Sequence, residues 1–336
     1  MSIRHVSPVP RRSASGRVAE VYAQSTADFG QAALMMLSPA PELHAAAWAV
    51  LRESELAGLA PRTDKEVVAV AVSLANGCRF CIDAHTILIH ALGEHQLAED
   101  LLHDRTPADQ HRAALVTWAK ATRTLHPADL ASPPFRAELA AEYIGTALST
   151  HFVNRMFSTL TDERLLPGDL QRAQPVRRAG ALAYTRTVHR ELGRGDSLPL
   201  LAGIPTAPSP LWAGETPMAT AFAALRGAAA AGATLLSEQS RLLLRAAVAE
   251  PAATGAQPHG PWLRQRLARL PEADRPAARL ALLAALAPHD VTEADVAAWR
   301  ATTGATDADL VRLLGYGAMT AVDRIEEAIT SPAPTR

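Results

Sequence analysis

The chain has 336 residues, a formal net charge of −1 and a hydrophobic content of 48%. A charge this close to zero gives no reason to expect nucleic acid or an anionic membrane surface as a partner. The lack of an apolar run of about 18 residues predicts no membrane span, and the basic start lacks the apolar core of a secretory signal, so we expect a cytoplasmic protein.

Alanine and leucine supply most of the apolar residues, and few aromatic or β-branched residues occur outside short stretches. This mix favours helix over strand, so we predict an all-α fold. Residues 1–25 are expected to form a flexible arm. The apolar spacing after it predicts helices over 29–37, 43–56, 64–76, 78–92, 98–102, 108–125 and 138–160.

Prolines punctuate residues 166–216, which predicts a linker with one helix at 179–192. Helical patterning returns over 217–330, and this part resembles a degenerate copy of 26–165. For example, Ala273-Asp274 opens a helix as Ala108-Asp109 does, but the second half contains no cysteine. We therefore predict two pseudo-equivalent helical domains, of which only the first carries a thiol site.

The only two cysteines, Cys78 and Cys81, are separated by two residues, and His85 follows one turn later. Asn76-Gly77 predicts a break between two helices, so Cys78 is expected at a helix start, with all three side chains on one face. A helix N-terminus stabilises a thiolate, because unpaired N–H groups and the helix dipole favour negative charge. In a cytosolic protein, such a pair is more typical of redox or metal chemistry than of a structural disulfide.

Glu66 precedes Cys78 by twelve positions. Together with Cys81 and His85 it forms a pattern that resembles the redox motif of the alkylhydroperoxidase D branch of the carboxymuconolactone decarboxylase superfamily. The resemblance covers residues 37–160. It implies an all-helical fold, a homo-oligomeric assembly and a cysteine pair at the start of a buried helix.

The resemblance also implies a role for each residue of the motif. Cys81 would attack the peroxide oxygen, and Cys78 would resolve the resulting sulfenic acid as a disulfide. Glu66 would accept the proton of Cys81 through water or through His85, and His85 would orient and relay.

The function implied is that of a thiol-dependent hydroperoxidase or disulfide oxidoreductase in antioxidant defence. Its substrate would be a hydroperoxide, and its reductant an external dithiol such as a lipoyl protein or a thioredoxin-like protein. No metal and no organic cofactor are expected. Phe80 stands where some members of the family carry a histidine, which leaves the relay to Glu66 and His85 and favours weaker peroxidase activity.

Two other functions stay open at this point. One is a non-catalytic helical assembly protein whose cysteines only sense oxidation. The other, less favoured, is a decarboxylase of the superfamily's other branch, in which the thiol pair would have no role.

The residues of the motif also have structural alternatives. Cys78, Cys81, His85 and His90 could supply four zinc ligands, although one helical stretch surrounds a tetrahedral ion poorly. Glu66 could close a capping box with Thr63 as N-cap. Asp83 is expected to face away from the site, and surface positions are expected for His90, His103, His111 and His126.

Overall fold

The computed structural model describes residues 2–125, 127–162, 164–250 and 260–331. Within these ranges the regular structure is helical without a strand, which confirms the all-α prediction. The α-helices are α1 (Gly16–Phe29), α2 (Pro41–Leu51), α3 (Arg62–Asn76), α4 (Arg79–Ala91), α5 (His95–Leu102), α6 (Gln110–Thr124), α7 (Pro127–Leu130), α8 (Ala140–Leu160), α9 (Gln174–Val188), α10 (Pro217–Ala230), α11 (Glu238–Ala249), α12 (Pro261–Leu267), α13 (Arg275–Leu286), α14 (Glu293–Thr303) and α15 (Asp307–Thr330).

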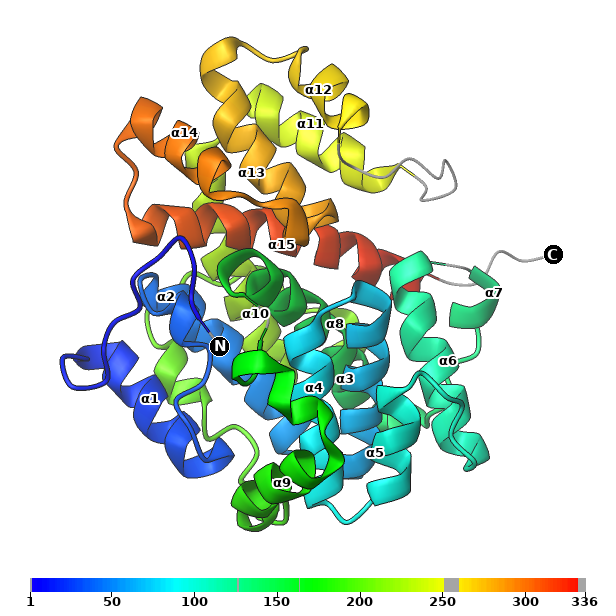
Figure 1. Ribbon diagram of the computed structural model, residues 1–336. Coiled ribbons are helices and arrows are strands. Elements are labelled where there is room, and N and C mark those ends of the chain that lie inside the picture. The colour runs from blue at the N-terminus through cyan, green and yellow to red at the C-terminus, as the bar shows by residue number, and fades with distance from the viewer. Residues whose placement is uncertain (1, 126, 163, 251–259, 332–336) are drawn as a thin grey trace.

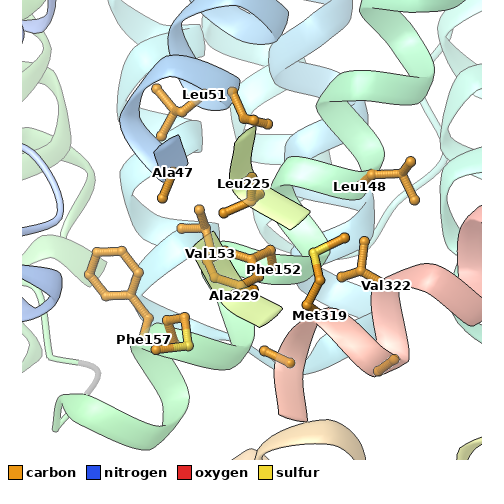
Figure 2. Close-up of a cluster of buried hydrophobic side chains, with 14 of the residues drawn as sticks. Ala47, Leu51, Leu148, Phe152, Val153, Phe157, Leu225, Ala229, Met319 and Val322 are labelled. Atoms are coloured by element: carbon orange, nitrogen blue, oxygen red, sulfur yellow. The ribbon is translucent and has the colours of Figure 1, made fainter. Parts of the chain in front are cut away.

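The two halves of the chain meet along α15, which crosses the molecule between α11–α14 on one side and the earlier helices on the other (Figure 1). Helix α15 packs on α8, and α10 packs on α2. Figure 2 shows Phe152 of α8 beside Leu225 of α10 and Met319 of α15. One apolar cluster extends from Val6 to Ile325, so both predicted domains contribute to the same core. The duplication itself stays a prediction.

The turn between α3 and α4 forms as the sequence predicts. Gly77 has a φ of 73°, a left-handed conformation that favours glycine, and it ends α3. The Cys78 N–H donates to the Ser73 carbonyl at 3.0 Å, which is the six-to-one bond of a Schellman motif. Cys78 is therefore the N-cap of α4, and the predicted helix start at the cysteine pair is confirmed.

The expected flexible arm over 1–25 is wrong where α1 begins at Gly16. Val21 and Tyr22 of α1 are buried, and the Tyr22 hydroxyl donates to the Val9 carbonyl at 2.9 Å. The Ile3 backbone pairs with Thr161. The prolines and arginines that suggested an arm lie ahead of a helix held by contacts with distant residues, which no local pattern reveals.

The proline-rich segment over 166–216 also differs from a linker. It contains α9, earlier than the predicted 179–192, and α9 packs on α4. The buried Arg52 donates to the Gly193 carbonyl at 2.9 Å, and Glu53 accepts from the Gly195 N–H at 2.7 Å. The segment is therefore anchored to the first half by charged groups, and Pro175 sits in the first turn of α9, where it disturbs no helical hydrogen bond.

One stretch, Pro217–Leu235, is long and apolar enough to cross a membrane by length and composition alone. It comprises α10 and a following 3-10 turn, and it is 56% buried inside the protein. Core helices of soluble proteins meet the same criterion, so this stretch is weak evidence for a span.

Candidate active site

The thiol pair sits at the N-terminus of α4. Cys78 is fully buried and Cys81 is 3% exposed, and both are present as thiols. The Cys78 carbonyl accepts from the Ile82 N–H at 3.0 Å, so the helix begins at the first cysteine. Cys81 lies in the first turn and His85 one turn later, which places them on one helical face. The positive end of the helix dipole is therefore directed at the thiols.

Glu66 reaches from α3 to the imidazole of His85. Glu66 Oε2 lies 2.7 Å from His85 Nδ1, and Oε1 accepts from Arg62 Nε at 2.7 Å. The Glu66 side chain is only 1% exposed and that of His85 14%. The structure thus joins two of the four predicted site residues directly, across the turn that carries Cys78.

The pKa values of this pair follow from their contact. Burial would lower the pKa of His85, but the hydrogen bond and negative charge of Glu66 outweigh it and raise that pKa. Burial would raise the pKa of Glu66, but the positive charge of Arg62 and the hydrogen bond with His85 lower it. Glu66 is therefore a stable anion that holds a protonated imidazole in place.

A second carboxyl group, Glu55, belongs to the site and was missed by the sequence prediction. Its pKa is raised to about 7, first by burial, while the charge of His85 lowers it and that of Glu66 raises it. Glu55 lies in a π-helical turn, Arg52–Leu56, that continues α2. Such turns are rare and occur often at functional sites. The signal available was charged residues clustered inside a predicted apolar helix.

The loop between this turn and α3 is fixed by Glu142 of α8. Its carboxylate accepts from the N–H groups of Leu59 and Ala60 at 2.7 and 2.8 Å. Lys65 Nζ donates to the Ala57 carbonyl at 2.6 Å and lies 3.3 Å from Glu142. Since Glu55 precedes this loop and Glu66 follows it, these bonds set where the two carboxylates lie.

Phe80, the residue that departs from the family pattern, packs toward α8. Its ring stacks on that of Phe157, with centroids 4.4 Å apart and planes 13° apart. Phe157 is part of the apolar cluster in Figure 2. Phe80 therefore fastens the start of α4 to the core and offers no polar group near the thiols.

The alternative role for Glu66 as part of a capping box is wrong. Helix α3 begins at Arg62 with Pro61 as N-cap, and no side chain caps it. Thr63 is already inside the helix, so its hydroxyl is not at the N-cap. The carboxylate of Glu66 is instead taken by Arg62 and His85.

The proposed zinc set does not come together around the thiols. His90 Nε2 lies 3.0 Å from Glu99, and its Nδ1 lies 3.1 Å from His95. The described parts of the chain hold no cluster of three or more residues suited to a metal ion. The surface position expected for His90 is also wrong, because this residue is only 2% exposed.

The other predicted side positions fall outside the site. Asp83 Oδ2 accepts from Gln171 Nε2 at 2.7 Å, on the side of α4 covered by the proline-rich segment. The side chains of His103 and His111 are about half exposed, at 58% and 48%. His126 lies outside the described residues.

The comparisons with known proteins agree with this geometry. Residues 42–128 match the model of the carboxymuconolactone decarboxylase family, and this range contains both cysteines and both carboxylates of the site. The chain is 40% identical to the alkyl hydroperoxide reductase Rv2159c of Mycobacterium tuberculosis, over 96% of this chain and 94% of that protein. No solved structure matches the chain. The chain belongs to the carboxymuconolactone decarboxylase superfamily, in its alkylhydroperoxidase D-like branch.

Proposed function

We propose that this protein is a thiol-dependent hydroperoxidase that reduces an organic hydroperoxide at Cys81. The observation that supports this most is the buried Glu66–His85 pair, held one helical turn beyond Cys81 on the same face of α4. The name of the relative from Mycobacterium tuberculosis points to the same chemistry. A decarboxylase would leave this arrangement of thiols, imidazole and carboxylates without a role.

The proposed reaction uses both sulfurs. The Cys81 thiolate attacks the terminal peroxide oxygen, so an S–O bond forms while the O–O bond breaks, and the alkoxide that leaves takes up a proton as an alcohol. The Cys78 thiolate then attacks Sγ of the Cys81 sulfenic acid, hydroxide leaves and is protonated to water, and a disulfide remains. An external dithiol reduces that disulfide and is itself oxidised to a disulfide.

The proton positions favour a division of labour between the two carboxylates. Glu66 was expected to accept the Cys81 proton, but a carboxylate with a lowered pKa is a weak base. Glu55, with a pKa of about 7, is better matched to accept that proton through His85 near neutral pH. His85, whose pKa is raised, would protonate the departing alkoxide.

The test is a peroxide-consumption assay on the reduced protein, with dihydrolipoamide or a thioredoxin system as the dithiol. A hydroperoxidase should turn over many times as long as dithiol is supplied. An oxidation sensor would consume one peroxide per chain and stop at the Cys78–Cys81 disulfide. No consumption by fully reduced protein would contradict the proposal.

Changing Glu55→Gln should remove the step near pH 7 from the pH–rate profile. In the wild type, the rate should rise as Glu55 loses its proton and becomes able to accept another. The variant should be slower by about 10²-fold, the lower end of what a positioned base contributes, and flat across this range. Steady-state rates between pH 5 and pH 9 measure this.

Stability gives a second measure of the same group. Because the folded-state pKa of Glu55 lies above its ordinary value, its contribution to stability is present below about pH 4.5 and is lost as the pH rises through 7. Thermal melts of Glu55→Gln should therefore lose less stability than the wild type over that interval. Glu53→Gln is the matched control, since Glu53 pairs with Arg52 and should alter stability but leave the pH–rate step in place.

A further inference from the structure

A polar cavity of about 210 Å³ lies behind the α3–α4 turn, where the two halves of the chain meet. The first half lines it with Asn76 of α3, Arg123 of α6 and Arg155 of α8, and the second half with His289 and Asp290. The cavity is lined by none of the thiol, imidazole or carboxylate groups of the candidate active site. It is therefore a separate feature.

Arg155 is buried in this cavity wall without a carboxylate partner. It is 5% exposed, and its guanidinium donates to the carbonyl oxygens of Ala285 and His151 at 3.0 and 2.9 Å. Burial, with the charge of Arg123 added, lowers the pKa of Arg155 to about 9. Among the described residues no carboxylate acts to raise that pKa. A buried cation in this condition is destabilising until an anion approaches it.

The other buried arginines of the described chain are treated differently. Arg52 Nε lies 2.7 Å from Asp28, and Arg177 lies 2.6 Å from Glu99. Only Arg155, of the three, has neutral oxygens as its partners. The chain thus supplies a carboxylate wherever a guanidinium is buried, except at this cavity.

Arg123 adds a second cation to the same wall. Burial lowers its pKa, and again no carboxylate in the described parts of the chain counteracts that. His151, beside Arg155, has a pKa well below its ordinary value because of burial and the two arginine charges, so it stays neutral. Asp290 is the one carboxylate in the lining, which leaves two cations against one anion.

We propose that this cavity binds a small oxyanion, a carboxylate or a phosphate, through the guanidinium groups of Arg123 and Arg155. Guanidinium forks match the planar pairs of oxygens that both ligand types present. Asn76 would feel its presence directly, because it lines the cavity and its carbonyl lies 3.2 Å from His289 Nε2. Two positions later the chain reaches Cys78, so the ligand would sit against the back of the thiol turn.

The test is binding of inorganic phosphate and of acetate to the full-length protein, by thermal shift and calorimetry at fixed ionic strength set with chloride. Saturable stabilisation by either anion beyond that of chloride is expected, and the arm that saturates identifies phosphate or carboxylate as the ligand class. Arg123→Gln should weaken that binding about tenfold or more, since a charge-assisted hydrogen bond is lost. Arg105→Gln, at an exposed arginine paired with Asp100, is the matched control and should bind as the wild type does.

A variant with the opposite sign guards against a fold defect. Asp290→Asn removes the one carboxylate of the lining and should tighten oxyanion binding. The proposal is overturned if neither anion differs from chloride, or if Arg123→Gln and Asp290→Asn both bind as the wild type does. Because no thiol is involved, this outcome is independent of whether the protein reduces peroxides.

Discussion

Replacing Cys81 with serine should reduce hydroperoxide consumption to the background rate. A serine hydroxyl stays protonated at neutral pH, and its oxygen has no counterpart of the sulfenic acid that a sulfur atom forms. The helix dipole at the start of α4 and the Glu66–His85 pair would remain, but they act only on a nucleophile that can carry the transferred oxygen. The measurement is peroxide loss under excess dithiol, with circular dichroism to show that the helices are intact.

Cys78→Ser is the matched control for this variant, because it removes the other buried thiol of the pair. It should still consume one peroxide per chain and should leave a sulfenic acid at Cys81, which a sulfenic-acid probe and mass spectrometry would locate. The reverse result, with the probe at Cys78 in Cys81→Ser, would exchange the two roles. Full turnover by Cys81→Ser would refute the peroxidase mechanism altogether.

The second large effect is expected from Glu66→Gln, with turnover about 10²-fold slower. The carboxylate is what raises the pKa of His85 against the effect of burial, so the amide should let that pKa fall. The imidazole would then lose its proton at a lower pH, and activity that needs a protonated His85 should decline at correspondingly lower pH. Proton NMR titration of His85 and the pH–rate profile report these two shifts separately.

Arg62→Gln separates position from charge at the same carboxylate. It removes a cation that lowers the pKa of Glu66 but leaves the 2.7 Å contact between Glu66 and His85 in place. It should therefore slow turnover much less than Glu66→Gln. If both variants lost activity equally with an unchanged His85 pKa, Glu66 would be a purely structural residue.

Much of this site could be predicted from the sequence because it depends on local rules. A glycine that permits a left-handed turn and a cysteine directly after it define the start of α4 whatever packs around them. The offsets of Cys78, Cys81 and His85 then place these residues on one face of a helix. The position of Glu66 on the preceding helix followed from resemblance, and the contact with His85 agrees with it.

What could not be predicted depends on distant residues. Glu55 looks like a solvated charge until the structure surrounds it with α3 and α8. The local capping pattern at Thr63 was satisfied on paper, yet Pro61 takes the N-cap position and Glu66 finds partners that a local pattern does not contain. In the same way, the prolines over 166–216 suggested a linker, because the buried charges of Arg52 and Glu53 that anchor it lie far away in sequence.

The π-helical turn over Arg52–Leu56 has a consequence for how related chains can be compared. It continues α2 without a break, and its wider coil accommodates one residue more than an α-helical turn of the same rise. Deleting a single residue there would restore α-helical winding and swing whatever follows by about 100° around the axis. A chain altered in this way would keep its cysteine spacing and its glutamate offset, yet the Glu55 carboxyl would face elsewhere. The length of this one turn therefore distinguishes sequences that retain the whole proton circuit from those that only carry the motif.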